Sequence, residues 1–493
     1  MKLLIPFFIV VLLIFSCSHK RNKLNNNEQE LAVQITNAEK EIREAKSSKQ
    51  VSNSFRDTFP PGFRFQEERS VDPQNPPVHL DVLGTQENVR EFKLSYFATN
   101  IKYIKLETPP DSMLFYTHPR YAGRLFSVFS DDKHMLIQGL HGIARFNMEG
   151  KFLEQIWKNE SGLTVTQKYV MTSPQEFYGV MNHNPISIFN GNLYLRFLDG
   201  NSKQVRIVKK EIQDNYVLKS PVTGQENLPD TIAGDKLLTI QGKRYSQRFP
   251  KIYGLSENSW AAINDTWNAA ETGAQFIIFN NNGDTLCDIS ANKTIQNWSK
   301  TTVRAGEPFT YYFKNQLTFI GQYSDTIFRI IPTNKLHPVY LLDFGKNKVG
   351  FMDGLNPDSD LSDKLMLNSI FETNEFLLLR YTKNLDSPRN RKSKSVTFYN
   401  AVFLKKENKL YHSLQPSQTA KNFENDVDGG ISFWPEFVTP KGDMLMLVTG
   451  KEIKEYVISK DFQNKEIPED QRQKQIQMAN ELNVNDKIVI VVN

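Results

Sequence analysis

The sequence predicts an all-β protein, specifically a six-bladed β-propeller with an N-terminal tether and a short C-terminal helix before a closing strand. Three observations predict this fold. Strand-like segments follow one another from Val78 almost to the C-terminus. They group into six units at a pitch of roughly 40–55 residues, which suits blades of four strands. One hairpin motif also recurs. The pattern leaves open a pair of stacked β-sandwiches, but no linker divides the chain.

The recurring hairpin reads as strand, tight turn, strand. The stretch 143–153 aligns without a gap with 276–286, and looser copies lie at 437–445 and 186–195. Glycine supplies the positive φ that such a turn needs, and asparagine suits the start of the turn. The matched positions are Phe146 with Phe279, Asn147 with Asn280, Gly150 with Gly283, and Leu153 with Leu286.

The C-terminal segment predicts how the fold closes. Residues 468–482 have the composition of a helix, and Lys487 to Val492 form an apolar, β-branched run typical of a strand. A last strand that pairs beside an early one would close the ring and remove open sheet edges. The early partner is expected at 102–106 or at 92–97.

The N-terminus predicts secretion and lipid attachment. An apolar run from Leu3 to Phe15 follows Lys2 and is shorter than the ~20 residues that span a bilayer. It ends in Ile14-Phe15-Ser16-Cys17, which resembles the lipobox of bacterial lipoproteins. We therefore expect a signal peptide at 1–16 and lipid on Cys17. The alternative is an uncleaved anchor or a chance cysteine after an apolar run.

Residues 17–58 are predicted to be a lipidated, flexible tether ahead of a propeller domain at 59–493, because they are polar and carry few apolar positions. A helix packed on the domain is the alternative. Ser18, rather than aspartate, follows the cysteine, which favours the outer membrane. The basic residues 19–21 favour its periplasmic face over surface display.

Composition limits the partners and the cysteine chemistry. The net charge of +5 is small for 493 residues and does not indicate nucleic-acid binding. The densest basic run, Arg389 to Lys394, is expected to be a solvated turn. Of the two cysteines, lipidation uses Cys17, so Cys287 has no partner within the chain for a disulfide or a cysteine metal site. We expect Cys287 to be a small buried residue in a strand.

A histidine pair, two acidic loops and two tryptophans could carry chemistry, but a structural role is expected for each of them. His134 and His141 could converge on a metal, but separate histidines are expected. The acidic loop 356–363 lacks the glycine and distal glutamate of an EF-hand calcium loop, so a solvated loop or helix cap is expected there. The acidic loop 425–430 could also hold a cation, but a turn is expected. Trp260 and Trp267 flank Asn-Asp and could stack on sugars, although core packing is expected. We therefore predict no catalytic, cofactor-binding or metal-binding residue, and no cofactor.

Several stretches resemble one family. The segment 103–108, the hairpin 146–152, the stretches 324–328 and 337–345, and the upstream residues 69–77 are similar to the six-bladed β-propeller lipoproteins of Bacteroides and relatives. The resemblance implies that fold and an envelope location. It implies no activity, so no functional residue carries over. The segment after 158–162 departs from the glycine-rich stretch of many relatives.

Two functions remain open from the sequence. The first is a membrane-anchored lipoprotein whose propeller acts as a binding or scaffold module for a glycan or an envelope protein. The alternative is a propeller hydrolase, similar to lactonases or glycosidases, with a metal or carboxylate site at the central channel. Propeller sites are assembled from different blades, so the lack of a linear motif does not decide between them.

Overall fold

In the computed structural model all described residues belong to one compact unit, 62–493. They are residues 75–109, 127–139, 142–158, 186–189, 192–198, 205–211, 231–232, 251–256, 259–263, 274–280, 285–290, 309–321, 324–331, 335–350, 353, 360–383, 397–413 and 421–493. The predicted signal peptide, Cys17 and the tether lie outside them.

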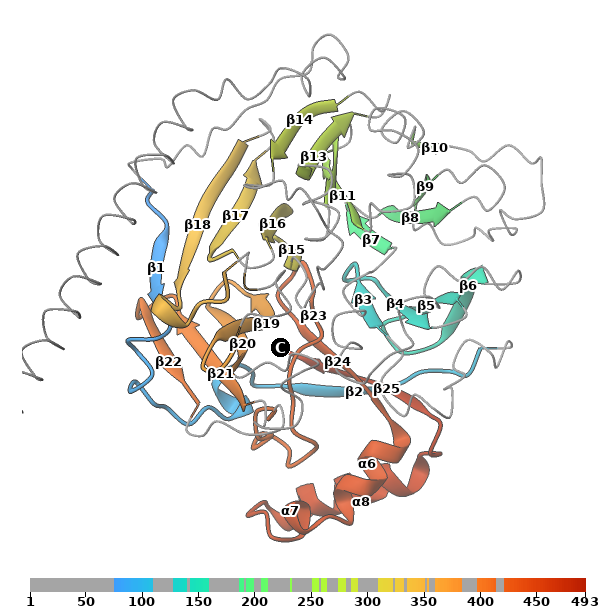
Figure 1. Cartoon of the computed structure of the whole chain (residues 1–493). Coiled ribbons are helices and arrows are strands. Elements are labelled where there is room, and N and C mark those ends of the chain that lie inside the picture. Colours follow the sequence, from blue (N-terminus) through green and yellow to red (C-terminus); the bar gives the residue numbers. More distant parts are fainter. Residues whose placement is uncertain are drawn as a thin grey trace, which may run out of the picture. The chain divides into compact units, whose positions relative to one another are not determined.

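The described strands form six sheets, five of four strands and one of five (Figure 1). The first three sheets follow the chain order. The β3–β6 sheet contains Ser127–Ser130, His134–Gly139, Gly142–Asn147 and Phe152–Lys158. The β7–β10 sheet contains Ile186–Phe189, Asn192–Leu198, Val205–Glu211 and Thr231–Ile232. The β11–β14 sheet contains Lys251–Ser256, Ser259–Ile263, Ala274–Asn280 and Thr285–Ser290.

The other three sheets follow, and two of them recruit an N-terminal strand. The β15–β18 sheet contains Phe309–Phe313, Gln316–Ile320, Thr326–Ile331 and Lys335–Asp343, with β1 (Val78–Asp81) added beside β18. The β19–β22 sheet contains Leu365–Glu372, Phe376–Lys383, Thr397–Leu404 and Lys409–His412. The closing sheet has the order β2 (Ile101–Lys105), β25 (Lys487–Val492), β24 (Met444–Thr449) and β23 (Phe437–Val438).

Neighbouring sheets meet through their inner strands. First strands contact each other in the pairs β7 with β11, β15 with β19, β19 with β23 and β23 with β3, whereas β11 contacts β16, the second strand of the next sheet. Within each sheet, consecutive strands pair as antiparallel neighbours. Up-and-down sheets that follow one another through their inner strands make a β-propeller, so the predicted all-β propeller is confirmed and the stacked-sandwich alternative is not what the chain forms.

The predicted hairpins are present, and the two aligned stretches pair at matching positions. Phe146 pairs with Phe152 across β5 and β6, and Phe279 pairs with Thr285 across β13 and β14. Gly150 has a φ of 85° and Gly442 a φ of 105°, which is the conformation that makes glycine necessary in these turns.

The closing sheet joins the two ends of the domain. Strand β25 pairs antiparallel with both β24 and β2, as predicted for the first of the two early segments. Its residues alternate between two cores because the sheet is buried on both faces. Ile488, Ile490 and Val492 pack toward the β19–β22 sheet, whereas Val489 and Val491 pack toward the β3–β6 sheet.

An N-terminal strap, residues 78–105, runs along the outer strands of three consecutive sheets. Its first part, β1, pairs in parallel with β18. Val89 then bridges His412 at the edge of the β19–β22 sheet, and β2 completes the closing sheet. Between them Phe92 and Leu94 insert into the core shared by the last two sheets. The strap thus fastens these three sheets to one another.

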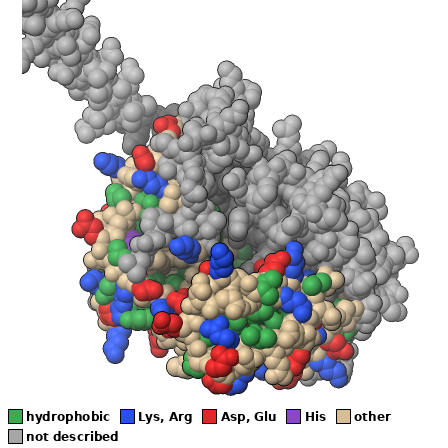
Figure 2. All heavy atoms as spheres, turned by 90° about the horizontal axis from the view of Figure 1, so that it is seen from below, with side chains coloured by type: hydrophobic (Ala, Val, Ile, Leu, Met, Phe, Trp, Pro, Cys, Tyr) green, Lys and Arg blue, Asp and Glu red, His purple; other side chains and the backbone are tan. Residues whose placement is uncertain are grey.

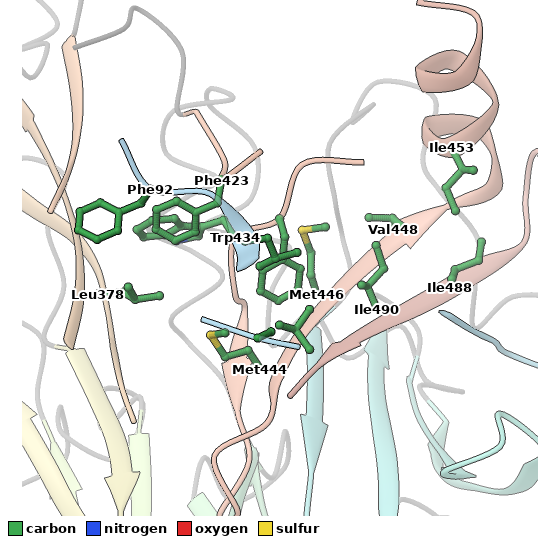
Figure 3. Packing of buried hydrophobic residues seen from close by; sticks show 14 of the residues in the cluster. Phe92, Leu378, Phe423, Trp434, Met444, Met446, Val448, Ile453, Ile488 and Ile490 are labelled. Atoms are coloured by element: carbon green, nitrogen blue, oxygen red, sulfur yellow. The ribbon is translucent and has the colours of Figure 1, made fainter. Parts of the chain in front are cut away.

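Three helices are inserted between β24 and β25: α6 (Gly450–Val457), α7 (Lys460–Gln463) and α8 (Glu469–Glu481), which lie together in Figure 1. Helix α8 matches the helix predicted at 468–482. The sequence predicts a last strand unit near 428–458, and this is wrong for 450–457, which form helix α6. Its Thr449–Glu452 capping box fixes the helix start, and Ile453 packs near Val448 and Ile488 (Figure 3).

No helix in the described part of the chain has the length and apolar character of a membrane span. Figure 2 shows the molecule from below relative to Figure 1. On this face basic and acidic side chains are interspersed over the described surface. Such mixing of signs is typical of a solvated surface without a strong field of one sign.

Candidate functional site

A carboxylate is buried where the β15–β18 and β19–β22 sheets meet. Glu372 ends β19, and its side chain has no exposed surface. Each of its oxygens accepts from one cation and one tyrosine hydroxyl. The four distances are 2.7 Å from Arg329 Nη2 and 2.9 Å from the Tyr311 hydroxyl to Oε2, and 2.8 Å from Lys405 Nζ and 2.9 Å from the Tyr340 hydroxyl to Oε1.

The charges around Glu372 fix its protonation state. Burial alone would raise the pKa of Glu372, but the Arg329 guanidinium and the Lys405 ammonium together bring it below its ordinary value. Burial, and then the charge of Glu372, raise the pKa of Tyr311 and of Tyr340. At neutral pH the carboxylate is therefore ionised, and both tyrosines keep the protons that they donate.

Arg329 and Lys405 also lie over one aromatic ring, that of Phe313. Phe313, the half-buried last residue of β15, has the Lys405 Nζ at 4.2 Å and the Arg329 guanidinium carbon at 4.5 Å from its ring centroid. The exposed Lys314 places its Nζ at 5.3 Å. Lys314 and Asn315 form the β15–β16 turn with φ of 50° and 59°. We call Lys314, Arg329, Lys405, Phe313 and Glu372 the Phe313 cluster.

The rest of β15 is joined to the preceding sheet. The Tyr312 hydroxyl donates to the Gly254 carbonyl at 2.8 Å, and the Thr310 hydroxyl bonds the hydroxyl of Tyr253. Both partners belong to β11. The hydroxyl groups of Thr310 and Tyr312 thus hold β15 against β11. They place Phe313 at a defined position at the end of β15.

The loop 425–430, considered for a cation, is closed by its own hydrogen bonds. Asp428 Oδ1 accepts from Asn425 Nδ2 at 2.7 Å, from the Gly430 amide at 3.0 Å and from the Tyr103 hydroxyl at 3.2 Å. Oδ1 of Asp428 is therefore used by the turn and by β2, and the loop is a structural junction with the strap.

The loop 356–363 is described only from Asp360 onward. There Asp363 Oδ1 lies 3.1 Å from Lys383 Nζ, and Asp360 accepts from the Ser362 amide at 2.8 Å. Within the described residues, no group of three or more histidine, cysteine, aspartate or glutamate side chains is placed to hold a metal ion.

The histidines have separate roles. His134 Nδ1 lies 3.2 Å from Asp131 Oδ2, whereas His141 lies outside the described residues, so their convergence is not tested. The buried His412 lies 2.9 Å from the Tyr381 hydroxyl and 3.1 Å from the Thr85 hydroxyl. Burial lowers the pKa of His412 to about 4, although Asp81 opposes this. A neutral imidazole therefore joins the strap to β22.

Other residues singled out by the sequence are placed as follows. Trp260 is 1% exposed and packs in the core, as expected, whereas Trp267 lies outside the described residues. Cys287 lies on β14 opposite Ile278, in the predicted strand. Cys17 and the basic run 389–394 fall outside the described residues.

Sequence reasoning did not find the Phe313 cluster. One signal was readable, namely a single glutamate at the end of the apolar stretch 365–372. Its partners come from β15, β17, β18 and the turn after β21, so no linear spacing connects them. The cluster exists only because the propeller brings two sheets together.

The fold and the site define this chain as an all-β propeller. Within its described part, the Phe313 cluster joins two adjacent sheets through buried ionic contacts. A family model described as "Domain of unknown function (DUF4933)" matches residues 60–459, and the chain belongs to this family. No curated protein matches the chain.

Three solved structures are similar to the chain at low identity. One is a member of the DUF4221 family from Bacteroides vulgatus, with a TM-score of 0.37 and 9% identity over 80% of this chain and 96% of that one. Another is a streptogramin B lyase, with a TM-score of 0.27 and 12% identity over 65% and 89%. The third is virginiamycin B lyase from Staphylococcus aureus, with a TM-score of 0.26 and 11% identity over 65% and 90%.

Proposed function

We propose that this protein is a lipid-anchored envelope protein whose propeller binds a ligand and carries out no reaction at the Phe313 cluster. The observation that carries the proposal is the state of Glu372. General acid–base catalysis needs a group that exchanges a proton with substrate. Glu372 has no exposed surface, is ionised and accepts four hydrogen bonds. It holds Arg329 and Lys405 in place and leaves them to face a ligand.

The proposal includes a ring of six blades, each corresponding to one of the six sheets. The contacts between inner strands of five neighbouring pairs of sheets, and the pairing of β25 with β2, support it. A closed ring is rigid and presents loops from several blades around one axis, which suits binding to an extended partner such as a glycan or an envelope protein.

The membrane location is proposed from the sequence at Cys17. The apolar run that ends at Ile14-Phe15-Ser16 supports cleavage before the cysteine, and Ser18 supports the outer membrane, with its periplasmic face preferred. Diacylglycerol at one residue, together with a further acyl chain, gives stable anchoring.

Anchoring is tested by mass spectrometry of the N-terminal peptide and by membrane fractionation. We expect acylated Cys17 at the mature N-terminus, and neither acylation nor cleavage before residue 17 in a Cys17→Ser variant. A matched Cys287→Ser variant should be cleaved and acylated as the wild type is. An unmodified N-terminus upstream of residue 17 would overturn the anchor.

Binding is tested by thermal unfolding of the full chain in detergent with envelope glycans or with divalent metals. A rise in melting temperature with a glycan supports the binding function, because a ligand that binds only the folded state stabilises it. Stabilisation by a metal, together with metal-dependent lactone or glycoside hydrolysis, would favour the hydrolase instead.

A further inference from the structure

The Phe313 cluster contains more positive than negative charge. Lys314, Arg329 and Lys405 surround one ring, with centroid distances of 5.3, 4.5 and 4.2 Å. Among the described residues, Glu372 is the one acid that pairs with any of them. Three cations thus share one buried anion. Burial lowers the pKa of Lys405, and Arg329 and Lys314 lower it further against the opposing effect of Glu372.

The three cations keep donors that the protein itself does not use. Lys405 Nζ donates to Glu372 and to the Thr373 carbonyl at 2.6 Å, which leaves one of its three N–H groups. Arg329 uses Nε toward Thr318 at 3.2 Å and Nη2 toward Glu372, and Nη1 takes part in neither bond. The Lys314 ammonium forms no hydrogen bond or ion pair with the described residues.

The position of these donors suits a ligand. Phe313 and Lys314 lie at the end of β15, and Glu372 ends β19, so the cluster lies where the first strands of two adjacent sheets meet. First strands line the central channel of a propeller. Arg329 and Lys405 are 14% and 19% exposed, so their charges are partly shielded from water yet can be reached.

We propose that Lys314, Arg329 and Lys405 bind an oxyanion, either the carboxylate of an acidic sugar or a phosphate group. This inference rests on the proposed binding function and names the chemistry of its ligand. A guanidinium and two ammonium groups form charge-assisted hydrogen bonds to such oxygens. Glu372 holds Arg329 and Lys405 in place before binding, so less conformational entropy is lost when the anion arrives.

The test is isothermal titration of the full chain in detergent, at neutral pH and constant ionic strength, with glucuronate, inorganic phosphate and glucose. We expect at least one anion to bind and glucose not to bind. The tighter anion identifies the source, a carboxylate or a phosphate group. Lys314→Asn should weaken its binding about tenfold, and Lys314→Arg should restore it.

The variant is chosen to leave the fold intact, because asparagine tolerates the positive φ of residue 314. Its melting temperature should match that of the wild-type chain. The control is Lys409→Asn, which removes another exposed lysine placed 4.9 Å from an aromatic centroid, that of Tyr411. This control should bind the anion as the wild type does.

The inference is overturned if neither anion binds, if Lys314→Asn binds as tightly as the wild type, or if Lys409→Asn loses as much affinity. Stabilisation by neutral glycans without anion binding would overturn this site while leaving the binding function in place. An unacylated Cys17 in the wild-type chain would contradict the anchor without affecting the titration. The two proposals therefore fail separately.

Discussion

Ile101 and Val492 lie directly opposite one another in the antiparallel pair of β2 and β25, although almost all of the described chain separates them. Strand β25 thus joins the two ends of the domain in one sheet. The middle of that strand is fully packed, since Ile490 is 1% exposed and lies between Tyr103 and Met446.

Ile490→Ala should therefore destabilise the whole domain by about 2–5 kcal/mol, the usual cost of truncating a buried isoleucine. Urea unfolding measures the loss. The control is Ile458→Ala, because Ile458 is 78% exposed and should change the stability by no more than about 0.5 kcal/mol. Equal effects of the two substitutions would contradict the role of β25 in closure.

A second prediction separates backbone strain from a steric clash at two turn glycines. Gly150 and Gly442 both have positive φ, but a Cβ on Gly150 would lie 2.2 Å from the Lys105 carbonyl oxygen, whereas one on Gly442 would meet nothing within 4 Å. Gly442→Ala should cost about 1–2 kcal/mol from strain alone. Gly150→Ala should cost more, because β2 has to move. Thermal unfolding of both variants compares them, and equal costs would contradict the clash.

A third prediction concerns Glu372. Its pKa is lower in the folded chain than the ordinary 4.5, so its contribution is complete above that pH and is lost as the pH falls through the folded value. Glu372→Gln should destabilise the protein by about 3–5 kcal/mol at pH 7, because two cations lose their buried partner. The substitution should also remove part of the loss of unfolding free energy that the wild type shows as the pH falls. Denaturant-induced unfolding between pH 3 and pH 7 measures both effects, and Glu375→Gln, at an exposed position, is the control.

A fourth prediction concerns His412, whose pKa is lowered to about 4 in the folded chain, against an ordinary 6.5. Between these values the unfolded chain takes up a proton that the folded chain does not. Stability is therefore complete above pH 6.5 and falls by about 3 kcal/mol as the pH drops toward 4. His412→Gln should flatten this part of the profile, and the mostly exposed His79→Gln should not. An unchanged slope in His412→Gln would show that another group is responsible.

The sequence was informative wherever a feature is local. The hairpins at 143–153 and 276–286 were readable because a turn glycine and strands of alternating pattern lie within a dozen residues. The last strand was readable because Lys487–Val492 is a β-branched apolar run. Helix α6 was not predicted, because the last strand unit was taken to run to about residue 458, although the Thr449 and Glu452 capping pair marks the start of the helix.

The site was not readable for the opposite reason. Glu372 is one glutamate in an apolar strand, and nothing in its neighbourhood indicates that Arg329 and Lys405 approach it from two different sheets. Linear motifs record contacts within a few residues, whereas the spacing of this cluster is set by the angle between blades. The three-dimensional fold is therefore needed before the charges can be counted together.

The N-terminal strap has a mechanical consequence. Tension applied to the chain ahead of Val78 reaches β1 first, and β1 is held to β18 by one short parallel ladder. Because that ladder lies at the edge of its sheet, β1 can separate from β18 before any tension reaches the pairing of β2 with β25. Strand β1 is thus the first paired element of the described chain to bear such a load, and its separation from β18 would leave the closing sheet intact.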